Sequence, residues 1–512
     1  MKRSLFLLAG ALGASLCLNG LCAPASAHEG APMLGKWGID LSGMDHQTVP
    51  GNDFFNYVNG NWVKHTVIPP DRSSIGSFTS LAILSERRTK TILAALEAKP
   101  HASLTPDERK LRDLYDAFLN EKAIAAAGLK PVRADLDRLE SLKTRSAIAA
   151  AMGDVRMMTA SPFAMSIGVD DKNPNAYAID LSQSGLGMPN RDYYLKTDPA
   201  IRATQAAYKV LLTRMLTMAG LKDAASRAAA VYALEHRMAE VEWPNAERRD
   251  ESKVYNPMPI SALIRLAPQF DWTAYFKAAG VSLDGPKGER IVIVAEKSAF
   301  PKLAQIFAQT PVSVWRDYLV AQYMSTFAPY LPRKVDDANF DFYGKVIRGQ
   351  SEQLPRTVRA AHLLDRELGQ ALGKLYVARY FPPIAKAKAE ELVRNLLRVY
   401  AADLKTLDWM TPQTRRRALE KLHKFTAQIG YPDKWRSYAA YKVSPHDLVG
   451  DVQRGTVFEW NRELKRIDKP VDRNEWFMNP QTVNAYYDPS FNEIVFPAAI
   501  LQPPFFDPNA DD

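Results

Sequence analysis

Helix-initiating motifs and helical periodicity dominate the central part of this sequence. Thr105-Pro106-Asp107-Glu108 combines a capping residue, a proline suited to the first helical position and a glutamate that can hydrogen bond back to the cap. Apolar residues then recur on one helical face, at Leu111, Leu114, Tyr115 and Phe118. Thr411-Pro412 and Ser444-Pro445-His446-Asp447 begin further predicted helices. The chain is therefore predicted to be mainly α, and predominantly helical from about Ser103 to Tyr438.

Length and a second helical repeat add to this picture. The repeat comprises Leu392, Val393, Leu396, Leu397, Tyr400 and Leu404. The chain has 512 residues, which is more than one simple hydrophobic core normally serves, so two or more domains are expected. No repeat at a fixed period and no low-complexity linker divides them.

The last segment of the sequence changes character. Thr482 to Tyr487 and Glu493 to Phe496 are short β-prone runs separated by turn residues, so two strands and a turn are predicted. The chain then ends with much apolar surface and nothing following to cover it, in contrast to the polar termini of most domains. This ending predicts a chain that is truncated within a domain and poorly soluble.

The N-terminus has the pattern of a secretory leader. Lys2 and Arg3 precede an almost wholly apolar run from Leu5 to Leu18, and Ala25-Ser26-Ala27 is a small-residue cleavage site. Residues 1–27 are therefore predicted to be a signal peptide, and the protein is expected to be exported to a periplasm or out of the cell. An uncleaved anchor is the alternative, although the run is shorter than the roughly twenty residues of a membrane span.

Cysteine and charge counts exclude several classes of function. Cys17 and Cys22 are the two cysteines, and both lie in the predicted leader. They leave a lipoprotein as an alternative, but the mature chain would contain neither disulfides nor a catalytic thiol. The net charge of +9 is a small difference between 66 basic and 57 acidic residues, so no nucleic-acid partner is expected. No stable membrane span is expected once the leader is cleaved.

The usual catalytic motifs are incomplete or missing. The sequence has no G-x-S-x-G elbow, and no two of its eight histidines are four residues apart, as a helical metal-binding pair requires. Gly369 to Lys374 resembles a phosphate-binding loop but is one residue short. Small residues that let another helix approach are the better interpretation of Gly369 and Gly373. No catalytic residue and no metal ligand is therefore assigned.

One segment is suited to peptide binding. Val483-Asn484-Ala485-Tyr486-Tyr487 lies at a predicted strand end, where the backbone and the Asn484 carboxamide could capture an extended peptide. From the residues alone, an ordinary turn residue is the better interpretation of Asn484.

A larger set of motifs resolves this choice by resemblance. It comprises Pro50-Gly51-Asn52-Asp53-Phe54-Phe55, Tyr57-Val58-Asn59-Gly60-Asn61-Trp62, Leu186-Gly187-Met188-Pro189-Asn190-Arg191-Asp192-Tyr193-Tyr194, Ile429-Gly430-Tyr431-Pro432-Asp433-Lys434-Trp435, Asn492-Glu493-Ile494-Val495-Phe496-Pro497-Ala498 and Ile500-Leu501-Gln502-Pro503-Pro504-Phe505-Phe506. These stretches, in this order, closely resemble the neprilysin and endothelin-converting-enzyme family of zinc metallopeptidases, including its bacterial oligopeptidase members.

The resemblance implies a site and a domain arrangement. It places substrate binding on Asn484 and Ala485, because an Asn-Ala pair on an edge strand holds the substrate backbone in this family. It implies a large helical domain that encloses a cavity, about residues 81–439, plus an incomplete thermolysin-like α/β catalytic lobe. Both flanks would join that lobe, with the N-terminal region over 28–480 and the start of the catalytic domain over 481–512.

The resemblance also implies a cofactor that these residues cannot hold. Family members bind zinc through H-E-x-x-H and a further glutamate, and this pattern is not present in the sequence. The first hypothesis is therefore a zinc metalloendopeptidase acting on peptides, here truncated before its zinc motif, inactive alone and without zinc. The alternative is a non-catalytic exported protein that binds peptides.

Overall fold

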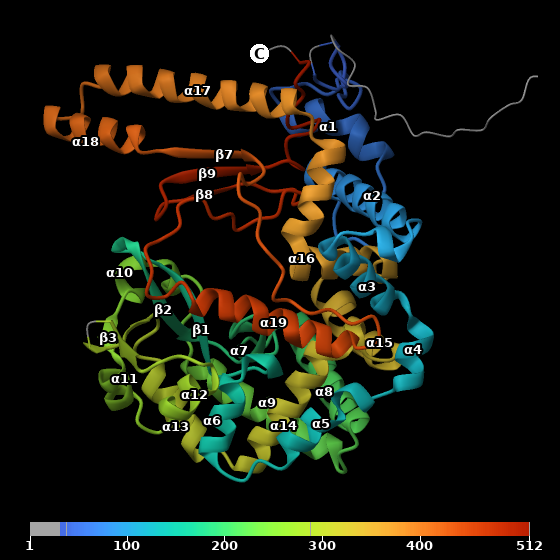
Figure 1. The fold of residues 1–512 in the computed structure, drawn as a ribbon, viewed down its shortest axis with the longest axis vertical. Coiled ribbons are helices and arrows are strands. Elements are labelled where there is room, and N and C mark those ends of the chain that lie inside the picture. The colour runs from blue at the N-terminus through green and yellow to red at the C-terminus, as the bar shows by residue number, and fades with distance from the viewer. Residues whose placement is uncertain (1–30, 37, 287, 511–512) are drawn as a thin grey trace, which may run out of the picture.

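The computed structural model describes residues 31–36, 38–286 and 288–510, so the predicted signal peptide lies outside the described residues. The chain forms a large helical body and a smaller lobe built around a three-stranded sheet (Figure 1). Long helix α16 (Arg356–Tyr380) runs from the body to the smaller lobe. The predicted mainly α class, with a helical domain, a cavity and a small α/β lobe, is confirmed.

The helices occupy most of the chain before the C-terminal sheet. Their bounds are α1 (Phe54–His65), α2 (Ser77–Glu97), α3 (Pro106–Leu119), α4 (Glu121–Ala127), α5 (Lys130–Glu140), α6 (Arg145–Gly153), α7 (Asp192–Leu195), α8 (Pro199–Ala219), α9 (Ala224–Val241), α10 (Glu251–Val254), α11 (Ile260–Leu266), α12 (Trp272–Ala278), α13 (Phe300–Gln309), α14 (Val312–Phe327), α15 (Arg333–Phe340), α17 (Pro383–Thr406), α18 (Pro412–His423) and α19 (Leu448–Leu464), with short 3-10 turns and one π-helical stretch (Asp341–Ile347) between them.

Local capping explains several of these helix starts. At α3 the Glu108 backbone N–H donates to Thr105 Oγ1 at 3.3 Å, and the Thr105 N–H donates to Glu108 Oε2 at 2.8 Å, so the predicted capping box is present. Thr411 caps α18 as expected. The helix predicted near Ser444 begins later, at Leu448, because Asp447 supplies the capping carboxylate.

The body contains a four-stranded sheet that the helical pattern did not reveal. Strands β1 (Phe163–Asp170) and β2 (Asn173–Gln183) form an antiparallel hairpin, and β6 (Ile291–Val294) joins β2 in parallel, followed by β3 (Pro257–Pro259). A separate two-stranded ladder pairs β4 (Asp284–Gly285) with β5 (Gly288–Glu289). Alternation of Phe163, Met165, Ile167 and Val169 was the available strand signal.

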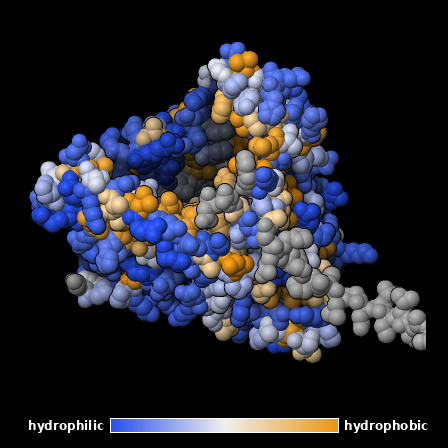
Figure 2. Space-filling model, turned by 90° about the horizontal axis from the view of Figure 1, so that it is seen from above, coloured by the Kyte–Doolittle hydropathy of each residue, from blue (hydrophilic) through white to orange (hydrophobic). Residues whose placement is uncertain are grey.

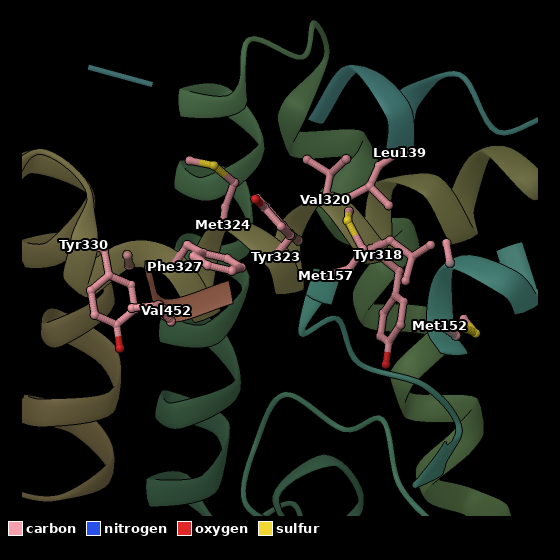
Figure 3. Packing of buried hydrophobic residues seen from close by; sticks show 14 of the residues in the cluster. Leu139, Met152, Met157, Tyr318, Val320, Tyr323, Met324, Phe327, Tyr330 and Val452 are labelled. Atoms are coloured by element: carbon pink, nitrogen blue, oxygen red, sulfur yellow. The ribbon is translucent and has the colours of Figure 1, made fainter. Parts of the chain in front are cut away.

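The core of the body lies around α14, which is buried on several sides. Figure 3 shows Tyr318, Tyr323 and Phe327 among side chains from other elements. Val452 of α19 lies in the same cluster and is fully buried. The core therefore draws on residues more than a hundred positions apart, and α19 is packed onto the body.

The glycines of α16 allow another segment of the chain to approach the helix closely. An added Cβ on Gly369 would lie 2.1 Å from Asn479 Nδ2, and one on Gly373 would lie 2.6 Å from Pro480 Cδ. The predicted interpretation as packing glycines is thus correct, but the approaching partner is a loop and not a helix.

A buried carboxyl group lies between the helices of the body. Glu235 on α9 accepts hydrogen bonds from Tyr194 at 2.8 Å, Tyr208 at 3.0 Å and Gln322 at 2.8 Å. Burial raises the pKa of Glu235 to about 7, although these donors oppose the shift. The folded protein therefore holds this proton more tightly than the unfolded chain does.

Replacing Glu235 should change how stability depends on pH. Between about 4.5 and about 7, the raised pKa makes the free energy of unfolding fall as pH rises. Glu235→Gln cannot lose a proton, so its decline across this window should be smaller by on the order of 3 kcal/mol. Urea unfolding at pH values across the window measures this, with the exposed Glu240→Gln on the same helix as control. Identical pH dependence in Glu235→Gln and the unmodified protein would contradict the assignment.

Candidate functional site

The three-stranded sheet of the small lobe has β7 (Thr426–Gly430) and β8 (Tyr486–Asp488) as its two edge strands. Strand β9 (Glu493–Pro497) is central: β7 pairs with it in parallel, and β8 pairs with it antiparallel. The predicted two strands and turn are therefore present, although the first strand is shorter than expected. Asp488 closes the turn by accepting from the backbone N–H of Ser490 at 2.8 Å and Phe491 at 3.2 Å.

Asn484 and Ala485 lie directly before the edge strand β8. Asn484 is exposed, and its Oδ1 accepts from the Ala485 N–H at 2.9 Å. Within the described part of the chain, no other strand pairs with these two residues or with the outer side of β8. An extended peptide could add to such an edge through backbone hydrogen bonds. The substrate-binding role of Asn484 and Ala485 stays a prediction.

The segment leading into β8 is anchored on α16 and α2. Gln481 Nε2 donates to Asp365 Oδ1 at 2.6 Å and to the Gly369 carbonyl at 2.9 Å. Ser85 Oγ donates to the Gln481 carbonyl at 2.7 Å. Since Gln481 lies three residues before Asn484, these bonds fix the position from which the edge strand departs.

The apolar C-terminal segment is largely covered. Val495 is fully buried and Ile500 is 7% exposed, whereas Phe505 is 42% exposed and contacts Phe78 at a ring distance of 4.6 Å. Phe381 and Tyr431 belong to the cluster that packs around this segment. The expectation of an uncovered segment is thus wrong for Val495 and Ile500, because earlier parts of the chain return to cover them.

The exposed apolar face of the small lobe lies elsewhere, on α17. This helix forms where the periodicity predicted it, but its buried residues are Ala385 and Ala389. The exposed members of its apolar face are Leu392 (51%), Leu396 (51%), Val399 (53%) and Tyr400 (60%). Seen from above, Figure 2 shows a hollowed surface with hydrophobic side chains along its border.

A cavity of about 820 Å³ lies between the body and the small lobe. Its walls include Tyr177 of β2, residues 426–429 of β7, and Arg462 of α19. The basic residues there are paired: Arg462 contacts Glu475 at 2.5 Å, and Arg436 contacts Glu459 at 3.0 Å. Burial alone would raise the pKa of Glu459, but the hydrogen bond and charge of Arg462, with the charge of Arg436, lower it. The cavity wall is therefore charged but largely neutralised.

The sequence did not predict that a carboxylate, that of Glu493, would be buried within the sheet. Glu493 on β9 is 1% exposed, and Gln428 Nε2 donates to its Oε2 at 2.7 Å. Burial raises the pKa of Glu493 to about 7. Its only signal in the sequence was a charged residue at the start of the apolar run Ile494-Val495-Phe496.

The described residues do not fit a zinc ion. Across residues 31–36, 38–286 and 288–510, no group of three or more His, Cys, Asp or Glu side chains is placed to hold a metal. His101 instead contacts Asp113 at 2.9 Å, and His362 contacts Glu86 at 3.1 Å. No catalytic step is therefore derived through a metal. Over the same described ranges, no helix is long and apolar enough to span a bilayer.

Comparison with known proteins agrees with this architecture. Residues 50–432 match the N-terminal model of peptidase family M13, and residues 484–512 match the second model of that family. Because the first match covers most of the chain, the protein belongs to peptidase family M13. The predicted relationship to neprilysin and the endothelin-converting enzymes is confirmed, and the chain is a metallopeptidase-family protein.

Individual relatives support the same family. Human endothelin-converting enzyme 1 is 29% identical over 482 residues, covering 91% of this chain and 62% of its own length. The Mycobacterium tuberculosis zinc metalloprotease Zmp1 in complex with inhibitor is 38% identical, with a TM-score of 0.86 over 93% of this chain and 72% of that one. Zmp1 in its open state is also 38% identical, with a TM-score of 0.77 over 91% and 72%. This chain thus spans less than two thirds of the human relative, and its arrangement is nearer to inhibitor-bound Zmp1 than to the open state.

The glycine at the end of β7, Gly430, should be required for the stability of the small lobe. Gly430 has a φ of +81°, and an added Cβ would lie 2.4 Å from Phe381 Cε1. Gly430→Ala should lower the stability of this lobe by about 1–3 kcal/mol through backbone strain and overpacking. Hydrogen exchange should accelerate in β7 and β9 but not in α14. Gly51→Ala, which has open space around the added methyl group, is the control; unchanged exchange in β7 and β9 would contradict this account.

Proposed function

We propose that this chain is the peptide-capturing part of an exported zinc metalloendopeptidase that depends on further polypeptide for catalysis. The observation that carries the proposal is the free edge of β8, preceded by the exposed Asn484 and the half-buried Ala485, in a chain of peptidase family M13. An extended peptide would pair with that edge, and the Asn484 carboxamide would add one donor and one acceptor. Peptides, not folded proteins, are the proposed substrates, because the body and the small lobe enclose the cavity.

The need for further polypeptide is proposed from the small lobe itself. The apolar face of α17 is half exposed to water, which is unfavourable in free energy. A stably folded lobe normally buries such a face. The human relative is longer, and the match to the second family model begins only at residue 484. We propose that the additional polypeptide packs on α17 and supplies the zinc ligands, which the described residues do not offer.

Domain boundaries and location belong to the same proposal. We propose a helical lid over about residues 81–439, with both flanks joining the catalytic lobe and the catalytic domain beginning near residue 481. The pairing of β7 with β9 supports one refinement, in which residues 383–430 accompany the small lobe. The proposal of export to a periplasm or the cell exterior is supported by the leader-like sequence of residues 1–27.

Removal of the Asn484 side chain should weaken peptide binding. Asn484→Ala deletes one or two hydrogen bonds to a bound backbone, so affinity for a short fluorescent unstructured peptide should fall about tenfold. Fluorescence anisotropy measures this, and Asn461→Ala, an exposed asparagine of α19, is the matched control. Equal affinities of Asn484→Ala and the unmodified chain would remove Asn484 from the site.

The 512-residue chain alone should bind peptides without cleaving them. We expect less than one zinc per chain by elemental analysis and no phenanthroline-sensitive cleavage of the same peptide. Stoichiometric zinc together with chelator-sensitive turnover would overturn the proposed dependence on further polypeptide. Peptide binding, combined with a coding sequence that has no H-E-x-x-H in any frame beyond codon 512, would instead favour the non-catalytic peptide-binding protein.

A further inference from the structure

A second cavity, of about 800 Å³, lies along α19 and is called here the α19 groove. One wall is α19 itself, which crosses the top of the body below the small lobe (Figure 1). The other wall is the loop of residues 437–442, and Pro131 and Arg156 of the body complete the lining. Ser437 and Arg462 line this groove and also the cavity between the body and the small lobe, so the two spaces adjoin.

The middle of the α19 groove is apolar and already formed. Val457 and Phe458 line it from α19, and the exposed Ala439 and Ala440 line it from the loop. The ring of Phe458 is stacked on that of Tyr441, with centres 5.7 Å apart and planes 20° apart. Because this packing holds Phe458 in place, the groove offers a ligand a fixed apolar surface.

The arginines of the α19 groove hold its walls together. Arg454 Nε donates to the Lys442 carbonyl at 3.1 Å, and its Nη1 donates to Asp447 Oδ2 at 2.8 Å. Arg156 donates to both carboxylate oxygens of Asp135, at 3.1 and 2.9 Å, and Asp135 is itself buried. These side chains therefore fix the loop and the body against α19, and their charges are already compensated.

Two lysines of the α19 groove are not used in this way. Lys442 belongs to the loop beside Arg454, and Lys465 lies at the end of α19. Both are exposed, and in the described part of the chain neither ammonium group makes a hydrogen bond or an ion pair. Arg454 and Lys465 are eleven residues apart on α19, which is about 16 Å along a helix.

This lining suits one kind of ligand. A small inorganic anion would reach only one of the two lysines and would leave the apolar middle uncovered. An extended peptide covers about 16 Å in roughly five residues. A peptide with a carboxylate near each lysine and an apolar side chain between them would therefore use both ends and the middle of the groove.

We propose that the α19 groove is a second peptide site, which binds an acidic segment of a peptide held in the adjoining cavity. Carboxylates of that segment pair with Lys442 and Lys465, and an apolar side chain packs on Val457 and Phe458. The groove thus selects acidic peptides among those that can reach the edge of β8. This inference rests on the proposed function for the peptide nature of the ligand.

Two fluorescent peptides that differ only in charge test the groove. One carries two glutamates about five positions apart on either side of a phenylalanine, and the other has glutamines in their place. By fluorescence anisotropy at low salt, the unmodified chain should bind the acidic peptide about fivefold more tightly, as two exposed ion pairs allow. Lys442→Ala combined with Lys465→Ala should remove this preference and leave the affinity for the glutamine peptide unchanged.

A matched pair of lysines separates a local effect from a change in net charge. Lys122→Ala on α4 combined with Lys277→Ala on α12 removes the same charge from exposed positions outside the groove, so the preference should remain. No preference in the unmodified chain, or an equal preference after loss of Lys442 and Lys465, would overturn the proposal.

A substitution that fills the α19 groove tests its location without changing a charge. Ala440→Phe should also abolish the preference, and because Ala440 is exposed the fold should tolerate the larger side chain. Ala126→Phe, at an exposed alanine of α4, is the control. An undiminished preference in Ala440→Phe would contradict the assignment to this groove.

The Asn484→Ala variant separates this inference from the proposed function. It should weaken both peptides and leave the preference for the acidic one. If only the acidic peptide binds, and its affinity depends on Lys442 and Lys465 but not on Asn484, the groove stands and the proposed function fails. If neither peptide binds, both fail.

Discussion

The parallel pairing of β7 with β9 is the constraint on which the arrangement of the two parts depends. Thr426 pairs with Glu493 and Gly430 with Pro497, so the chain between them must travel the length of the sheet before it returns. It does so through the body, where Gln453 of α19 lies 3.5 Å from the Tyr323 hydroxyl of α14, and it comes back over the glycines of α16. The crossover therefore ties the small lobe to the core of the body, and it leaves β8 at the edge of the sheet.

Buried carboxylates are stabilised differently in the core of the body and along the cavity. Inside the body, Glu235 is surrounded by hydroxyl and amide donors and has no cation among its hydrogen-bond donors, so burial dominates its pKa. Along the cavity, Arg436 and Arg462 lie against Glu459 and Glu475, and their charges compensate one another. Buried neutral networks suit a rigid core, whereas compensated ion pairs suit a surface that meets water and ligands. This division fits a stable body beside a cavity that exchanges its contents.

Local signals predicted those elements whose stability is local. Thr105 and Glu108 form a capping box because the partners are three residues apart, and the turn after β8 forms because Asp488 reaches the next backbone amides. The four-stranded sheet of the body was missed because β2 and β6 meet across more than a hundred residues, and a short apolar run such as Ile291–Val294 suits a buried helix equally well. Asn484 was identified by resemblance, whereas the anchoring of its segment by Gln481 depends on contacts with α16 that no local pattern contains.

The sequence by itself determined the mainly helical class, the family, the strand-turn-strand end and the absence of an H-E-x-x-H motif, because each depends on neighbouring residues or on a long ordered set of motifs. Only the tertiary structure decided which apolar residues are covered, burying Val495 while leaving Leu396 on α17 half exposed. It alone brought Arg473 between Pro174 and Ser490. Burial and contact between distant segments depend on the path of the whole chain. The periodicity of one segment shows which residues share a face of a helix or strand, but not what packs against that face.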